Sequence, residues 1–261
     1  MTAAVELAGV GKTFRGRTSV IAVEDVDLAI GAGEFVTFIG PSGCGKSTLL
    51  RLVADLTEPT TGTVTVNGKT ARQARLDQDY GIAFQQAGLM EWRTVARNVE
   101  LPLELRGWDR RRRRAHAREL LDLVGLPEFA DARPAELSGG MQQRVAIARA
   151  LATGPKLLLM DEPFGALDEM TRERLQAELT RIAGESGATV VFVTHSIPEA
   201  VYLSDRVVVL SARPGRVAAI VDVPLGERSD DTREAPEFFA KVTEVREALR
   251  GRTAVRTVEE R

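Results

Sequence analysis

The stretch "GPSGCGKST", residues 40–48, decides the fold of this chain. The apolar run "FVTFI" precedes it, and "LLRLV" follows with the character of a helix. Glycines let the backbone curl so that successive N–H groups point at phosphate oxygens, and the next helix adds its dipole. A strand before and a helix after distinguish a P-loop from an ordinary glycine-rich turn. The predicted phosphate-binding residues are Gly40, Pro41, Ser42, Gly43, Cys44, Gly45, Lys46, Ser47 and Thr48.

This loop predicts a nucleoside triphosphate bound with Mg²⁺. Lys46 would reach the β- and γ-phosphates, and the Ser47 hydroxyl would ligate the metal. Further along, "LLLMDE" reads as a buried strand ending in Asp161, which would hold Mg²⁺ directly or through water. Glu162 would then act as general base on the water that attacks the γ-phosphate. An apolar run ending in Asp-Glu is a weak signal alone, and the P-loop before it makes the pair specific.

Composition limits the kinds of protein and of site that the chain can represent. The chain has 261 residues, and 35 Lys plus Arg against 37 Asp plus Glu leave a net charge of −2, so no global field attracts nucleic acid. Cys44 is the only cysteine, which excludes a disulfide within the chain and a cysteine-based metal site. We read it as a small residue tolerated in the loop rather than as a reactive thiol. The N-terminus lacks the pattern of a signal peptide, and no apolar run approaches the roughly 18 residues of a membrane-spanning helix. These features predict a cytoplasmic location.

The pattern along the chain predicts an α/β fold. Apolar runs at 26–30, 34–40 and 62–68 indicate strands, and segments at about 94–106, 110–124 and 138–152 indicate helices. From 156 onward strands and helices alternate, as in a parallel sheet covered by helices. One amphipathic stretch places Leu175, Leu179 and Ile182 on one face. A last helix is expected to carry Phe238, Phe239, Val242, Val245 and Leu249 on one side.

Arg110 to Arg114 form a charge run. No aromatic residues alternate with these arginines to stack on bases, so a solvated helix face, near lipid head groups or a partner, is favoured over a nucleic-acid patch. His116, on the same predicted helix, is expected to be exposed.

The segment "LSGGMQQRVAIARAL", residues 137–151, resembles the signature of the ATP-binding cassette (ABC) ATPases. Ser138 can cap the helix that begins there, and its hydroxyl, the Gly139 and Gly140 amides and the helix dipole would form a second phosphate-binding surface. The resemblance spans about residues 5–225. It implies a P-loop NTPase with a RecA-like core, an N-terminal antiparallel β subdomain and a helical subdomain at about 88–152. Residues 1–225 would form the ATPase domain and 226–261 a short C-terminal helical extension.

The resemblance also assigns expected roles to single residues. Phe14 stands where the family stacks a ring on adenine, although a lone Phe is otherwise a core residue. Gln85 matches the glutamine that touches Mg²⁺ and the attacking water, with Gln86 as a neighbouring alternative. His195 matches the histidine that contacts the γ-phosphate and positions Glu162. Two further residues are implied at the nucleotide. They are Gln142, in the signature, and Asp168, in a loop that contacts the other subunit or caps a helix.

In the family, the signature of one cassette closes over the nucleotide of another. The resemblance therefore implies an ATP-bound homodimer, or a heterodimer with a similar chain. It further implies separate permease subunits, an extracytoplasmic solute-binding protein and a peripheral position on the cytoplasmic face of the membrane. The segments "VVVLSARPGRV" and "APEFFAKVTEVREAL" resemble the branch that imports nitrate, sulfonate and taurine. Alternatives are an exporter subunit, a P-loop kinase, or a soluble ABC ATPase acting on nucleic acid or ribosomes. Two fused cassettes or a long coiled-coil insertion would mark the last class, and the sequence has neither.

Overall fold

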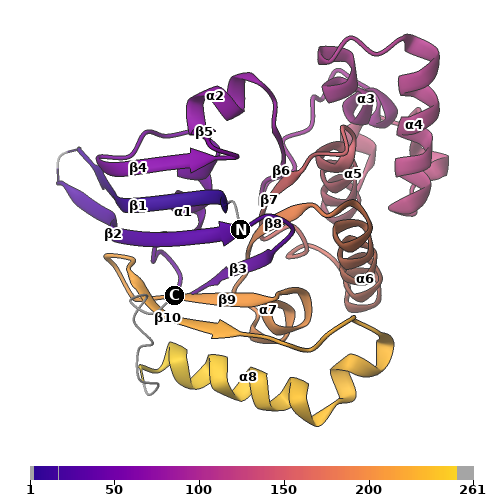
Figure 1. Ribbon diagram of the computed structural model, residues 1–261. Coiled ribbons are helices and arrows are strands. Elements are labelled where there is room, and N and C mark those ends of the chain that lie inside the picture. The colour runs from indigo at the N-terminus through magenta and orange to yellow at the C-terminus, as the bar shows by residue number, and fades with distance from the viewer. Residues whose placement is uncertain (1–2, 17, 252–261) are drawn as a thin grey trace.

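The computed structural model describes residues 3–16 and 18–251, and it contains two sheets (Figure 1). The first is antiparallel, in the order β2-β1-β4-β5. Side chains on β2 alternate between buried and exposed along most of its length, as expected of a sheet with one face against a core and one toward solvent. Its strands are β1 (Ala3–Phe14), β2 (Val20–Gly31), β4 (Thr61–Val66) and β5 (Lys69–Thr70).

The second sheet has the order β10-β9-β3-β8-β7-β6. Its five strands from β9 to β6 run parallel, and β10 pairs antiparallel with β9 at one edge. Every residue of β3, β7 and β8 is buried, because helices and the other sheet cover both faces. The strands are β3 (Phe35–Ile39), β6 (Tyr80–Ala83), β7 (Leu157–Asp161), β8 (Thr189–Val193), β9 (Arg206–Leu210) and β10 (Val217–Asp222).

Helix α1 (Lys46–Val53) joins the two sheets into one core. Its buried leucines, Leu49, Leu50 and Leu52, pack in a cluster with residues from β1, β2, β3 and β8. This packing holds the start of α1 against the end of β3, where the glycine-rich loop lies.

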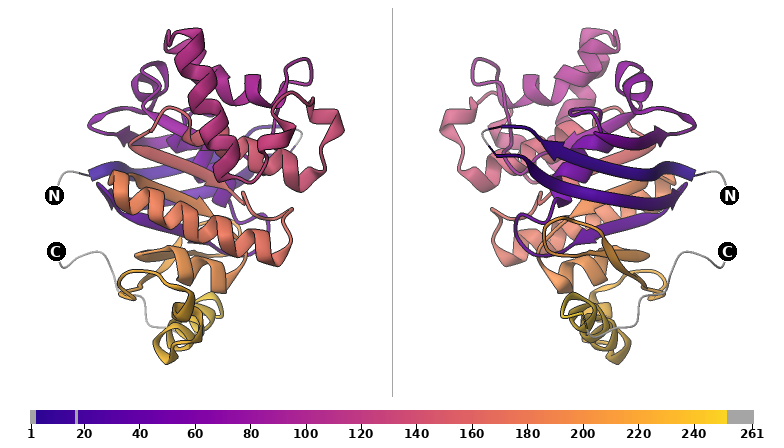
Figure 2. Two further views of the ribbon diagram at one scale, coloured as in Figure 1. Left: turned by 90° about the vertical axis from the view of Figure 1, so that its right-hand side faces the viewer. Right: turned by 90° about the vertical axis from the view of Figure 1, so that its left-hand side faces the viewer.

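Two groups of helices lie at opposite ends of the molecule (Figure 2). At one end α3 (Val95–Leu105), α4 (Arg110–Leu123) and α5 (Gly139–Leu151) pack on one another. Side chains of Thr94, Asp109 and Ser138 cap their N-termini. At the other end α8 (Pro236–Leu249) packs on α7, β9 and β10. The other helices are α2 (Ala71–Leu76), α6 (Glu169–Ser186) and α7 (Ile197–Leu203), with 3₁₀ turns at Pro127–Phe129, Pro134–Glu136 and Asp230–Glu234.

Two expectations about side chains were wrong. Phe239 is 56% exposed, because the face of α8 that turns inward is formed by Phe238, Val242 and Val245. His116 is partly buried: its Nε2 lies 3.1 Å from the Ala152 carbonyl oxygen, since this side of α4 faces the end of α5.

The arginine run divides between solvent and intramolecular contacts. Arg113 pairs with Glu100 at 3.1 Å, and the Arg112 guanidinium lies 3.7 Å from the centroid of the Trp108 ring. The other three arginines are exposed. Within the described part of the chain, no helix has the length and apolar character needed to cross a bilayer. Residues 252–261, the end of the expected C-terminal extension, lie outside the described residues.

Candidate functional site

Four neighbouring parallel strands end at one edge of the large sheet. In sheet order these are β3, β8, β7 and β6. The P-loop follows β3, His195 follows β8, Glu162 follows β7 and Gln85 follows β6. Because the carboxyl ends of parallel strands meet at one edge, segments far apart in sequence form one site.

The P-loop requires glycine at defined positions. A Cβ atom on Gly40 would lie 2.9 Å from the Leu210 carbonyl oxygen, and one on Gly45 would lie 2.8 Å from that of Ala22. Gly45 also has φ +106°, a conformation that other residues rarely adopt. The Lys46 ammonium donates hydrogen bonds to the carbonyl oxygens of Gly40 at 2.8 Å and Pro41 at 3.2 Å. The cation therefore lies against the backbone of its own loop.

The loop between β9 and β10 supports the P-loop from outside. A Cβ on Gly215 would lie only 2.0 Å from the Cys44 carbonyl oxygen, so the two backbones are in close contact. The Arg213 guanidinium donates to the Gly43 carbonyl oxygen at 3.2 Å. The Cys44 thiol is buried. The sequence predicted none of these contacts, because nothing local to residues 211–216 points to a loop about 170 residues earlier.

Ser47 and Asp161 meet at the centre of the site. The Ser47 hydroxyl donates to Asp161 Oδ1 at 2.8 Å, and Asp161 is 3% exposed. Burial raises the pKa of this carboxyl, and the hydrogen bond from Ser47 opposes that change. Hydroxyl and carboxylate oxygens are ligands that Mg²⁺ prefers. Water and substrate phosphates supply the rest of its coordination shell in such sites. The donor set therefore fits Mg²⁺. The described residues contain no cluster of three or more His, Cys, Asp or Glu side chains that would bind a metal alone.

Glu162 faces two polar side chains. Its Oε2 lies 3.2 Å from His195 Nδ1 and accepts a hydrogen bond from Gln85 Nε2 at 3.4 Å. Its φ of +48° is unusual for a residue other than glycine, and such strain concentrates at functional sites. Between the two neighbouring glutamines, it is Gln85 whose side chain contacts Glu162. His195 is 69% exposed, so its ring remains accessible beside the carboxylate.

Helix α5 holds the loop that carries Gln85. Gln143 Nε2 donates to the Phe84 carbonyl oxygen at 2.8 Å. The Arg149 guanidinium donates to the carbonyl oxygens of Ala87 at 2.7 Å and Gly88 at 2.8 Å, and burial lowers its pKa. These backbone contacts lie on both sides of Gln85. The sequence predicted neither, and polar residues within a largely buried helix were the one available signal.

The second predicted phosphate-binding surface lies at the start of α5. Ser138 Oγ accepts a hydrogen bond from Met141 N at 3.3 Å and so caps the helix, leaving Gly139 and Gly140 in its first turn. The Gln142 side chain donates to the carbonyl oxygens of Pro134 and Leu137 in the preceding turn. Among the described residues, no hydrogen bond or ion pair connects 138–142 with 40–48.

Two further predicted residues lie at the margins. Asp168 caps α6 by accepting from Thr171 N at 3.0 Å, and this bond lowers the pKa of its carboxyl. Phe14, at the end of β1, is 46% exposed with Lys12 Nζ 5.2 Å from its ring centroid. Phe14 is therefore not a core residue, which was the alternative open from the sequence.

Comparison with known proteins identifies the same family across the chain. The ABC transporter family profile matches residues 23–165. A nitrate import ATP-binding protein of Synechocystis sp. is 44% identical over 261 residues, covering 97% of both chains. A taurine import ATP-binding protein of Rhizobium johnstonii is 48% identical over 237 residues, covering 90% of this chain and 89% of the relative. Among solved structures, the dimeric ATP-binding cassette MJ0796 in a post-hydrolysis state with ADP and Pi is 38% identical. It has a TM-score of 0.78 and covers 84% of this chain and 98% of its own.

Proposed function

The chain belongs to the ABC transporter family and is an ATP-binding and ATP-hydrolysing protein, and from this premise we propose that it is the ATPase subunit of a multi-subunit importer. The proposal separates two tasks. This chain binds and hydrolyses ATP, and separate permease subunits carry the solute through the membrane. The names of the nitrate and taurine import relatives support import as the direction.

The observation that carries the proposal is the contact of Glu162 with His195 and Gln85 beside the P-loop. Glu162 is the group that accepts a proton from the attacking water. His195 orients that carboxylate and faces the γ-phosphate, and Gln85 approaches both water and metal. An acceptor positioned in this way contributes a rate factor of about 10²–10⁴.

On the other side of the phosphates, Lys46 leaves its loop carbonyls to pair with the β- and γ-phosphate oxygens. Ser47 and Asp161 would hold Mg²⁺, with Gln85 as a third ligand. When bound, Mg²⁺ neutralises charge on the phosphate oxygens. Phe14 stacks on the adenine ring from the C-terminal end of β1.

We propose that two copies of the chain complete the site head to tail. The start of α5 presents a capped helix N-terminus and two glycine amides, a surface suited to an anion. In such a dimer, Ser138, Gly139, Gly140 and Gln142 would approach the γ-phosphate held by the partner's P-loop, with Asp168 near the axis. The dimeric MJ0796 cassette supports the pairing of two copies.

The permease partner would dock between the sheet and the helical group. A pocket of about 280 Å³ lies there, lined by apolar side chains of β6 and α3, including Tyr80, Ile82, Leu101 and Leu105. Leu105 is 67% exposed. Arg149 lines the pocket and also binds the Gln85 loop, so a helix seated here would contact the element that positions Gln85. A peripheral position on the cytoplasmic face of the membrane follows from this docking.

The solute proposed is a small anion or zwitterion such as nitrate, a sulfonate or taurine, delivered by an extracytoplasmic binding protein. A pull-down of tagged Glu162→Gln protein with Mg-ATP from solubilised membranes of its host tests the proposal. We expect a permease-like membrane protein to co-purify, identified by mass spectrometry. The matched control is the Lys46→Ala/Glu162→Gln protein, which should capture less because it cannot close on ATP. Recovery of ribosomal or nucleic-acid-binding proteins alone would reject the importer assignment.

A further inference from the structure

The loop that carries His195 is anchored by buried side chains on both sides of the histidine. Thr194 Oγ1 donates a hydrogen bond to Glu199 Oε2, and Ser196 N donates to Thr194 Oγ1 at 3.0 Å. Glu199 N in turn donates to Ser196 Oγ at 3.4 Å. Thr194 and Glu199 are both buried. The position of His195 therefore depends on where the Glu199 carboxylate is held.

The Glu199 carboxylate is held by a side chain from another helix. Gln176, which is buried on α6, donates from Nε2 to Glu199 Oε1 at 2.8 Å. Its Oε1 accepts from Arg233 Nη2 at 2.7 Å. An amide can rotate to exchange its oxygen and nitrogen, and the cation fixes which end faces the carboxylate. Without Arg233, Gln176 could turn its oxygen toward Glu199, where two acceptors would repel.

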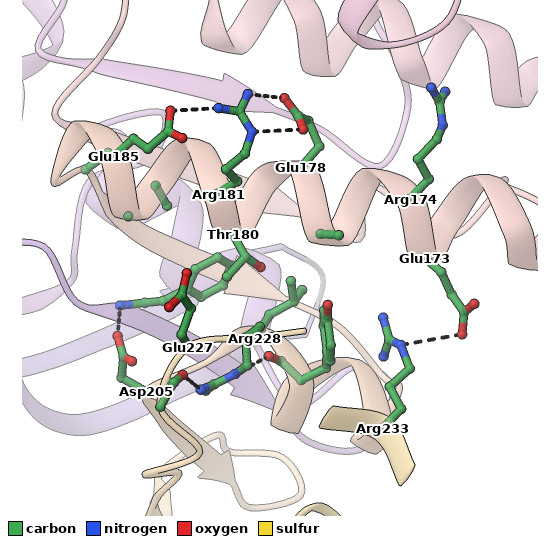
Figure 3. Close-up of a pocket in the computed structure, with 18 of the residues that line it drawn as sticks. Glu173, Arg174, Glu178, Thr180, Arg181, Glu185, Asp205, Glu227, Arg228 and Arg233 are labelled. Carbon is green, nitrogen blue, oxygen red and sulfur yellow. Dashed lines mark hydrogen bonds and ion pairs between the residues drawn. The ribbon is translucent and has the colours of Figure 1, made fainter. Parts of the chain in front are cut away.

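Arg233 comes from the segment after the second sheet, and two contacts hold it besides the one with Gln176. Its guanidinium lies 3.5 Å from the centroid of the Tyr202 ring, and Nε lies 3.5 Å from Glu173 Oε1 (Figure 3). From the same segment, Arg228 donates to the carbonyl oxygens of Tyr202 and Ser204, both at 2.7 Å. Helix α7 is thus held at its C-terminal end by residues 228–233, and its N-terminal end follows His195.

A groove of about 1130 Å³ opens beside this junction, between α6 and the C-terminal segment (Figure 3). Several of its charged side chains bind one another or the backbone: Arg181 pairs with Glu178 and Glu185, and Asp205 accepts from Phe35 N at 2.9 Å. This internal pairing favours a structural role for the groove over binding of a charged ligand.

We infer that Arg233 is a positioning residue for ATP hydrolysis, which acts on His195 through Gln176, Glu199 and Thr194. The inference rests on the role proposed above for His195. It assigns to the C-terminal segment a function in the chemistry of the site: this segment sets the orientation of the imidazole beside Glu162.

The chain has two histidines, so the imidazole signals can be observed directly. Histidine-labelled protein would be compared by NMR as wild type and as Arg233→Met, which keeps apolar contact with Tyr202 and removes the donors. We expect the His195 ring resonances to shift or broaden while those of His116 stay in place. Arg250→Met is the matched control, since Arg250 lies on the same segment and pairs with Glu247 of its own helix. It should move neither histidine. Equal shifts of both histidines, or none of His195, would overturn the inference.

Kinetics supply the second readout. We expect Arg233→Met to lower kcat for ATP hydrolysis about threefold to tenfold with KM for ATP unchanged. Glu199→Gln interrupts the same chain of contacts beyond Gln176, and the double variant should be no slower than the slower single one. It also tests the chain if Arg233→Met does not fold. Multiplied effects, or an unchanged kcat, would reject the inference. A His195→Ala protein at the wild-type rate would instead refute the proposed role of His195, and the NMR comparison would still decide whether Arg233 positions it.

Discussion

At the scale of single residues, the Glu162 carboxylate makes the most specific prediction. Replacement by Gln keeps the size and the contacts with Gln85 and His195 but removes the proton acceptor. We expect kcat to fall about 10²–10⁴-fold, the range typical of a lost general base, with ATP affinity retained. A phosphate-release assay and equilibrium nucleotide binding measure the two quantities. Glu185→Gln, an exposed carboxylate on α6, is the control and should behave as wild type. Hydrolysis at the normal rate by Glu162→Gln would exclude it as the base.

A second residue-scale prediction concerns Glu199 and pH. Burial raises the pKa of this carboxyl, against the opposing effects of Thr194, Gln176, Arg172 and His195. In the unfolded chain, this carboxyl therefore loses its proton at a lower pH than in the folded protein. The stabilising contribution is fully present below the ordinary pKa of about 4.5 and is lost as the pH rises through the folded pKa. Relative to wild type, Glu199→Gln should gain stability as the pH rises above the ordinary pKa of about 4.5, which urea unfolding at each pH measures. A difference independent of pH would contradict the raised pKa.

At the scale of elements, the contact between β6 and α5 should tolerate no side chain at Gly81. A Cβ there would lie 2.0 Å from the Ala150 carbonyl oxygen and 2.9 Å from Pro155 Cγ. We expect Gly81→Ala to lower the free energy of unfolding by about 1–3 kcal/mol, because strand and helix must separate. Gly184 is the matched control, since it lies within α6 with no atom within 4 Å of its added Cβ. Gly184→Ala should raise that free energy by about 0.5–1 kcal/mol. Urea unfolding measures both, and a change of the same sign would refute the packing argument.

Local sequence patterns predicted some of the strands and helices and missed others. Strands β3, β7, β8 and β9 are continuous apolar runs, and α3 to α5 begin at side chains that cap them, so local patterns found them. Strands β1 and β6 contain glycines that weaken a strand pattern. Atoms far away in the sequence require these glycines. An added Cβ on Gly81 would clash with the Ala150 carbonyl oxygen, and one on Gly11 would lie 2.4 Å from Thr61 Oγ1. A residue chosen by a tertiary contact gives no local signal.

The residues of the site also fall into two groups, those that the sequence predicted and those that it did not. Motifs close in sequence predicted which residues lie at the sheet edge, and the structure brings Gln85, Glu162 and His195 into contact. The residues that hold these groups were not predicted, since Arg149 acts about 60 residues from its partners and Arg233 nearly 60 from Gln176. Their side chains bind backbone or amide oxygens, which any sequence offers at every position. Only the fold selects among them.

At the scale of the whole molecule, the two proposed phosphate-binding surfaces are separate. The P-loop lies at the edge of the large sheet, and Ser138 begins a helix of the group at one end of the molecule. Each surface has the chemistry for one side of a nucleotide. A chain with one of each can satisfy both only by meeting a second copy, and a two-fold axis then creates two equivalent sites.

This arrangement predicts that two inactive variants restore activity when mixed. Lys46→Ala disables the P-loop and Ser138→Arg blocks the start of α5, so each protein alone should be inactive. A mixed dimer has one intact site, formed by the P-loop of the Ser138→Arg chain and the α5 of the Lys46→Ala chain. When equal amounts are mixed, about half of the dimers contain one chain of each variant, and each of these has one intact site out of two. Hydrolysis should therefore reach up to about a quarter of the wild-type rate. The control mixes Lys46→Ala with the Lys46→Ala/Ser138→Arg double variant, which has no intact P-loop and should stay inactive. If the first mixture also stays inactive while both proteins fold and dimerise, each nucleotide site is built from a single chain.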